Sequence, residues 1–296
     1  MFTRVKATAI SLKPEKWNKL HNAEKMENLF VKASRKKPDV ILETEGALEG
    51  YVVLDVLEQP ERAAEFLEIA EPIDGPYINR FRTLAKKLKT CLCFGFAERI
   101  KQEVYNAAIF IGPDGEICGK YHKTQFAEGT HPTEYFNRIG KKIRAFETPI
   151  GRAGFLICND RWNPDIARTL VLDGASLLLI PSYGSKSKEQ NETVLARARE
   201  NGVPIVEANV GMNLIVSKGE IVAYKWGDDQ ITTSIIEIPI PATKKVARES
   251  ELNYLKTQKV EMLKRHRKRK DDNWFKMIKN RKFYRYSHGS KPGGTA

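Results

Sequence analysis

The chain has 296 residues, of which 41% are hydrophobic and 29% charged, a balance that supports a folded core and excludes wholesale disorder. No apolar run approaches the ~20 residues of a membrane-spanning helix, and the N-terminus runs into a strand-like segment without a signal-peptide core, so we expect a cytoplasmic protein. The net charge of +13 is local, because residues 244–296 hold 17 Lys and Arg against 5 Asp and Glu, whereas the first 243 residues hold 33 against 32. The basic excess therefore gives no reason to expect nucleic-acid binding by the main body.

Strand-like apolar runs and helical segments alternate along most of the chain. Several of the runs are apolar on both faces, as expected for strands buried between two layers. Strands are expected at residues 5–10, 39–42, 91–96, 105–111, 153–157, 176–180, 204–208, 214–217 and 233–238.

Helices are predicted where apolar residues recur at 3.6-residue spacing. Met26, Phe30 and Ala33 share one face after Asn22, a suitable N-cap. The other expected elements are helices at 78–88, 164–174 and 188–202 and a tight turn between two strands at 112–115. The alternation predicts one layered α/β domain over residues 1–243, followed by a basic C-terminal arm over residues 244–296.

The four cysteines are too few to indicate a disulfide scaffold, which agrees with a reducing compartment. Cys91 and Cys93 lie two residues apart on an expected strand, so their side chains face the same side. One Cys-x-Cys pair without a second pair or a histidine cluster is a poor zinc site. We interpret both as core residues, and the sequence implies neither a metal nor an organic cofactor.

Cys158 follows the apolar run Gly154–Ile157 and precedes a helix that begins near Pro164. A nucleophile between a buried strand and a helix sits at the tip of a sharp turn, although a structural cysteine would give the same pattern. A thiol with an ordinary pKa of ~8.5 needs a base or a nearby positive charge to attack at neutral pH. None of the five histidines lies in a motif that would orient it, so another residue must be the base.

Three separated segments resemble, in order, the motifs of the nitrilase-like carbon–nitrogen hydrolases. Glu45 lies six residues before Tyr51 of a Gly-Tyr pair, Lys123 ends a Tyr-His-Lys run, and Cys158 forms the third motif. With its flanking segments, the resemblance covers residues 4–240. It implies an α/β fold of the four-layer αββα sandwich type and a hydrolase that cleaves a non-peptide C–N bond, of an amide or N-carbamoyl group, through a Cys thioester.

The same resemblance implies roles for individual residues. Glu45 would be the general base, while Lys123 and the backbone N–H of Asn159 would stabilise the developing oxyanion. The family also carries a second, substrate-orienting glutamate ahead of a glycine. Glu134 is the candidate for this residue, and Glu128 is the alternative.

The Cys-Asn-Asp-Arg run at 158–161 resembles the nucleophile motif of N-carbamoyl-D-amino-acid amidohydrolases, in which the arginine binds the substrate carboxylate. A guanidinium matches a carboxylate with two parallel hydrogen bonds. Arg161 is therefore expected either to bind a carboxylate-bearing substrate or to pair with Asp160 or another acid within the fold.

Three departures from the family pattern weaken the carbamoylase assignment more than the hydrolase assignment. Thr124-Gln125 follow the lysine where x-His is usual, Ser11 stands where Gln is frequent, and the segment 209–214 is shortened.

The basic arm carries a charged run at 263–270, followed by aromatic residues that include Trp274, Phe283 and Tyr284. Such a composition can bind nucleic acid. We favour an arm that packs on a neighbouring subunit of a homodimer or larger homo-oligomer, as the resemblance implies. The alternative function is a catalytically retired binding protein whose arm docks nucleic acid or an acidic partner, which the intact set of three catalytic residues disfavours.

Overall fold

The computed structural model describes residues 2–126, 137–184, 186–239, 251, 253–257, 260–262 and 264. Its strands are β1 (Phe2–Ile10), β2 (Val40–Leu42), β3 (Cys91–Ile100), β4 (Glu103–Ile111), β5 (Ile117–His122), β6 (Ala153–Phe155), β7 (Leu177–Ser182), β8 (Ile205–Asn209), β9 (Met212–Ser217), β10 (Glu220–Trp226) and β11 (Ile231–Pro239). They form a six-stranded sheet of order β11-β1-β2-β3-β4-β5 and a five-stranded sheet of order β10-β9-β8-β7-β6.

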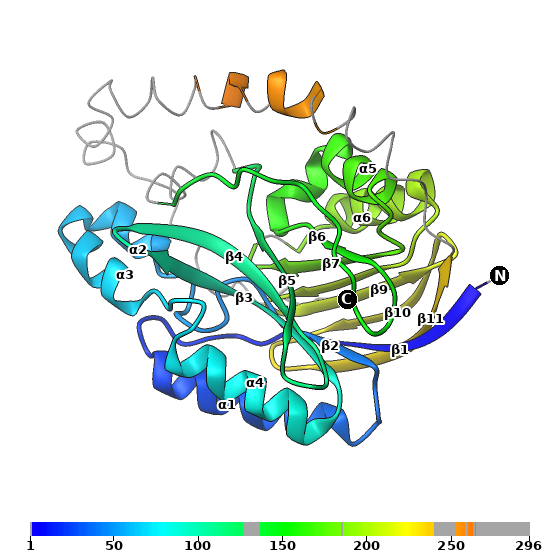
Figure 1. Ribbon diagram of the computed structural model, residues 1–296, viewed down its shortest axis with the longest axis horizontal. Coiled ribbons are helices and arrows are strands. Elements are labelled where there is room, and N and C mark those ends of the chain that lie inside the picture. The colour runs from blue at the N-terminus through cyan, green and yellow to red at the C-terminus, as the bar shows by residue number, and fades with distance from the viewer. Residues whose placement is uncertain are drawn as a thin grey trace, which may run out of the picture.

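Helices cover the outer face of each sheet, as Figure 1 shows. α1 (Lys19–Ser34) and α4 (Pro76–Leu88) lie on the six-stranded sheet, and α5 (Pro164–Leu172) and α6 (Lys188–Asn201) lie on the five-stranded sheet. α2 (Val53–Glu58), the 3₁₀ helix η1 (Pro60–Arg62) and α3 (Ala63–Ile69) gather at one end. The arrangement is the four-layer αββα sandwich that the family resemblance implies.

Alternation along the strands assigns each side chain to a layer. On β2, Val40 and Leu42 enter the core between the two sheets, whereas Ile41 faces α1 and α4. All three side chains are fully buried, and burying one aliphatic side chain of this size contributes about 1.5–3 kcal/mol. This two-sided burial explains why the central strands read as continuous apolar runs.

Each of the nine predicted strands is present, and the cores also bury Cys91 and Cys93. The turn at 112–115 joins β4 to β5, with the Gly115 N–H donating to the Gly112 carbonyl at 2.9 Å. The start of the first helix was predicted wrongly. α1 begins one turn earlier, capped by the Asn18 side chain, and Asn22 is buried within it, where its amide binds the backbone of Glu15.

The described part of the C-terminal segment is helical and packs on the five-stranded half. Tyr254 is fully buried among residues of α5 and α6, and Met262 is 1% exposed. Glu251 accepts a hydrogen bond from the Ile143 N–H at 3.1 Å. Trp274, Phe283 and Tyr284, the aromatic residues expected at a subunit contact, lie outside the described residues. Among the described residues, no helix is both long and apolar enough to span a membrane.

Candidate active site

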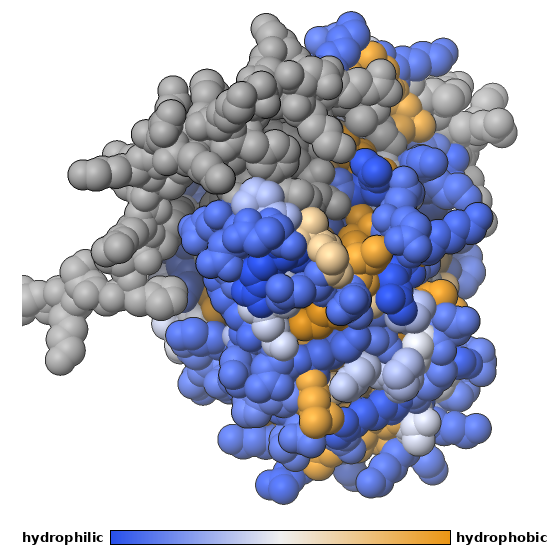
Figure 2. Space-filling model, turned by 90° about the vertical axis from the view of Figure 1, so that its left-hand side faces the viewer, coloured by the Kyte–Doolittle hydropathy of each residue, from blue (hydrophilic) through white to orange (hydrophobic). Residues whose placement is uncertain are grey.

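The site lies where the carboxyl ends of β2, β5, β6 and β7 meet at one end of the sandwich. Glu45 follows β2, Lys123 follows β5, Cys158 follows β6 and Tyr183 follows β7. Figure 2 views this end of the molecule, where small apolar areas lie between polar side chains. Residues far apart in the sequence are thus brought together by strand direction alone.

The Glu45 carboxylate is fully buried and accepts three hydrogen bonds. Its Oε1 accepts from Lys123 Nζ at 2.9 Å and from Asn106 Nδ2 at 2.7 Å. Its Oε2 accepts from the backbone N–H of Tyr183 at 2.8 Å. Gly95 on β3 makes this placement possible, because a Cβ at that position would lie 2.6 Å from the Cα of Glu45.

Lys123 is held by its backbone as well as by its charge. Its N–H donates to the Asn106 carbonyl at 2.9 Å, and its carbonyl accepts from the Gly140 N–H at 2.8 Å. The side chain is 1% exposed. A buried ammonium of this kind is stable only beside a partner charge, which Glu45 supplies.

Cys158 opens the 3₁₀ helix η3 (Cys158–Trp162) with a φ of +46°, a left-handed conformation that costs a non-glycine residue energy. Its Sγ faces the Tyr183 carbonyl oxygen at 4.0 Å. Tyr183 therefore contacts Glu45 through its N–H and the thiol through its carbonyl. Gly184 lies next to the sulfur, because a Cβ built at that position would lie 3.5 Å from Sγ.

The two cysteines on β3, Cys91 and Cys93, lie in a different environment from Cys158. Burial raises the pKa of Cys91 to about 12, and burial also raises the pKa of Cys93 well above its usual value. All four cysteines are free, and Cys158 is partly exposed. The two β3 cysteines are thus inert core residues, as the sequence indicates.

Arg161 is 1% exposed, and each of its three guanidinium nitrogens is hydrogen-bonded inside the chain. Nε donates to the Cys158 carbonyl at 2.6 Å, Nη2 donates to Ser182 Oγ at 2.5 Å, and Nη1 pairs with Glu207. The geometry is that of an internal ion pair with Glu207, the second of the two alternatives, although the partner is not Asp160.

Asp160 connects the nucleophile turn to the loop that carries Lys123. Its carboxylate accepts hydrogen bonds from the backbone N–H groups of Ile157 and Gln125, each at 2.8 Å. Burial raises the pKa of Asp160 to about 6, and these hydrogen bonds and the Lys123 charge counter the shift. Sequence reasoning missed this role and those of Asn106 and Tyr183. Tyr183 acts through its backbone, so its side chain gives no signal in a sequence.

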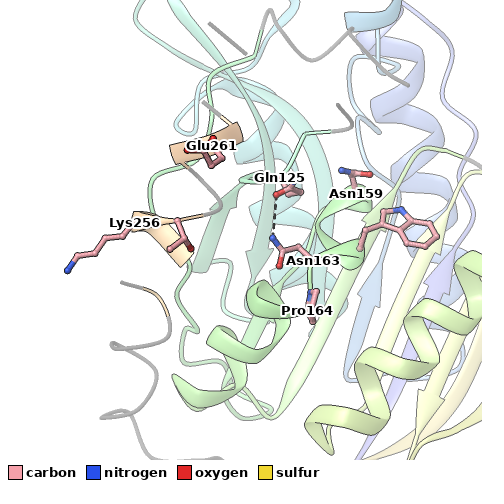
Figure 3. Close-up of a pocket in the computed structure, with 8 residues that line it drawn as sticks. Gln125, Asn159, Asn163, Pro164, Lys256 and Glu261 are labelled. Atoms are coloured by element: carbon pink, nitrogen blue, oxygen red, sulfur yellow. Dashed lines mark hydrogen bonds between the residues drawn. The ribbon is translucent and has the colours of Figure 1, made fainter. Parts of the chain in front are cut away.

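A cavity of about 690 Å³ lies beside the nucleophile turn (Figure 3). It is lined by Gln125, Asn159, Trp162, Asn163, Pro164, Lys256, Thr257 and Glu261. The Asn159 side chain donates to the Phe126 carbonyl at 2.9 Å. The cavity is thus amide-rich, and one of its walls comes from the C-terminal segment.

Glu134 and its alternative Glu128 both lie outside the described residues. Within the part of the chain that is described, no group of three or more His, Cys, Asp or Glu side chains is placed to hold a metal ion.

Comparison with known proteins identifies the family of the chain. A model of the carbon-nitrogen hydrolase family matches residues 6–248. The N-carbamoylputrescine amidase of Oryza sativa is 32% identical over 198 residues, which are 66% of this chain and 62% of that protein. The citrullinase of Francisella tularensis is 28% identical over 228 residues, 73% of this chain and 77% of the relative.

The fold has close structural neighbours as well. The crystal structure of Saccharomyces cerevisiae Nit3, a member of the nitrilase superfamily, superposes with a TM-score of 0.68 at 18% identity, covering 79% of this chain and 90% of the other. The family match spans both sheets and all three predicted motifs. The chain therefore belongs to the carbon–nitrogen hydrolase family and is a hydrolase of carbon–nitrogen bonds.

Proposed function

We propose that the chain hydrolyses the terminal carbamoyl or amide group of a small molecule through a covalent intermediate on Cys158. The observation that supports this most is the shared contact at Tyr183, which joins the buried Lys123–Glu45 pair to the thiol. Tyr183 thus contacts both the carboxylate of that ion pair and the thiol, and a base, a cation and a nucleophile are the parts that acyl transfer requires.

In the proposed reaction, Glu45 takes the thiol proton while the sulfur attacks the carbonyl carbon. Lys123 and the backbone N–H of Asn159 stabilise the oxyanion, and loss of one such donor typically costs ~10²–10³ in rate. The C–N bond then breaks, and the leaving nitrogen takes the proton from Glu45. Water, deprotonated by Glu45, hydrolyses the S-acyl intermediate and regenerates the thiol.

The relatives suggest a substrate with a terminal ureido group. The named activities of the rice and Francisella proteins are directed at N-carbamoylputrescine and citrulline, which share that group and differ in the rest of the molecule. With such a substrate, the first step releases the amine. The second releases carbamate, which decomposes to ammonia and carbon dioxide.

A carboxylate on the substrate is a separate proposal that the geometry of Arg161 does not favour. Its nitrogens already bind the Cys158 carbonyl, Ser182 and Glu207. We propose instead that Arg161 holds the nucleophile turn in place, and that specificity resides in the carbamoyl group.

Ammonia release from N-carbamoylputrescine, citrulline, an N-carbamoyl amino acid and a simple amide would test the proposed function. We expect at least one ureido compound to be cleaved, and we expect Cys158→Ala to lower the rate by about 10⁴ or more. Cys118→Ala is the matched control, because this half-buried thiol lies on β5 and not in the site. Turnover that survives in Cys158→Ala would overturn the proposal.

A further inference from the structure

The Asp160 carboxylate is the meeting point of four hydrogen-bond donors. Besides the N–H groups of Ile157 and Gln125, it accepts from the Tyr121 hydroxyl at 2.9 Å and from Thr124 Oγ1 at 3.4 Å. The Tyr121 and Thr124 hydroxyl oxygens also lie 2.7 Å apart. Because each hydroxyl has one proton and that of Tyr121 goes to Asp160, the Thr124 proton is shared between the Tyr121 oxygen and Asp160. The carboxylate is fully buried, so these donors replace the water that a carboxylate would otherwise need.

The donors and the carboxylate belong to two chain segments, one around Lys123 and one around Cys158. Tyr121, Thr124 and Gln125 surround Lys123 in the chain, whereas Asp160 is two residues beyond Cys158. A single carboxylate thus ties the backbone that carries the lysine to the turn that carries the thiol. The two segments come from different sheets, β5 from one and β6 from the other.

The C-terminal segment touches the same network. The Tyr254 hydroxyl lies 3.5 Å from the Thr124 carbonyl oxygen, and the Tyr254 side chain is fully buried in the core cluster that also holds residues of α5 and α6. Glu251 holds the start of this segment through the Ile143 N–H and through an ion pair with Arg144. Thr124 is therefore held from one side by Asp160 and from the other by a residue beyond the expected domain boundary at 243.

We infer that Asp160 is a positioning residue that sets the distance between Lys123 and Cys158, and that Tyr254 of the C-terminal segment stabilises this arrangement through Thr124. The inference rests on the proposed function, because it concerns how the proposed catalytic groups are held. A displacement of about 1 Å in such a constellation can cost on the order of 10² in rate. The C-terminal segment then contributes to catalysis within its own chain, besides any part it has in assembly.

The sharpest test removes a hydroxyl without changing shape. Thr124→Val deletes one donor of the network, and Thr124→Ser restores it. On whichever ureido compound the wild type cleaves, Thr124→Val should lower kcat about tenfold with KM within about twofold, and Thr124→Ser should recover most of the loss. Asp160→Asn should lower kcat about 10²-fold, and Tyr254→Phe about threefold to tenfold.

A second readout needs no substrate. The rate at which iodoacetamide alkylates Cys158, measured by mass spectrometry in a Cys118→Ala background, should fall in Thr124→Val and recover in Thr124→Ser. Thermal unfolding shows whether each variant is folded. Folded Thr124→Val, Asp160→Asn and Tyr254→Phe proteins with wild-type kcat and alkylation rates would overturn the inference. Activity in Cys158→Ala would instead overturn the proposed function itself, so the two failures are distinguishable.

Discussion

Two buried ion pairs flank Cys158, one on each sheet. Lys123 and Glu45 come from the six-stranded sheet, and Arg161 and Glu207 come from the five-stranded sheet. All four side chains are 1% exposed or less. By burial and charge alone the two pairs are alike.

The two pairs differ in the groups that their cations bind. Arg161 binds the carbonyl of Cys158 itself and a hydroxyl on β7, so it holds backbone. Lys123 binds the carboxylate that reaches Tyr183, the residue that faces the thiol. A buried charge beside a nucleophile is thus not in itself a substrate contact. The groups that a buried charged side chain already binds indicate whether its role is structural or chemical.

Replacing Lys123 should have the largest effect. Lys123→Met should lower kcat/KM by roughly 10³, because the proposed oxyanion loses its cation. The removal also leaves the buried Glu45 carboxylate without a counter-charge, so folding is checked by circular dichroism. Lys120→Met is the control, since this lysine lies on β5, three residues before Lys123, and pairs with Glu98. A loss below tenfold in a folded Lys123→Met protein would contradict the chemical role.

Replacing Arg161 should chiefly affect stability. Arg161→Ala leaves Glu207 uncompensated in the interior and should lower the free energy of unfolding by about 3–5 kcal/mol, measured by urea titration. At a temperature where the variant stays folded, its kcat/KM should fall equally for substrates with and without a carboxylate. A rise in KM confined to carboxylate-bearing substrates would restore the role first expected for Arg161.

Glu49, which lies near Glu45, should give the smallest effect, a change of stability with pH. Burial raises its pKa to about 7, and the Glu45 carboxylate adds to the shift. The folded protein therefore binds a proton that the unfolded chain releases near pH 4.5. The contribution of Glu49 to the free energy of unfolding should therefore decline by roughly 3 kcal/mol as the pH rises from about 4.5 to about 7. Unfolding free energies of Glu49→Gln should lack this decline, and parallel pH curves for both proteins would contradict the shift.

The sequence predicts the layers of the fold well because central strands and amphipathic helices carry strong periodicity. It anticipated a strand after the turn at 112–115 but gave no bounds for β5, and it missed β10. The residues of both strands are mostly exposed or half-buried and therefore mixed in polarity. It also missed α2 and α3, which are only six and seven residues long. The first helix was started at Asn22 because a buried asparagine and a capping one look alike in a sequence.

The motifs located Glu45, Lys123 and Cys158, yet they gave no information on what each group binds. Arg161 illustrates the limit, because its partner Glu207 lies 46 positions away on β8. Asp160 illustrates it further. Its four donors come from two separate segments, and two of the donors are backbone N–H groups, which every residue except proline carries.

The position of the site between the two sheets has a consequence for how the protein fails on heating. Glu45 and Lys123 follow strands of one sheet, whereas Cys158 and Tyr183 follow strands of the other. A slight sliding of the layers would separate proton acceptor from sulfur while every helix stayed intact. On the proposed mechanism we therefore expect activity to be lost at a lower temperature than helix content, so a melting curve that follows helix content would overstate the temperature at which the protein still turns over.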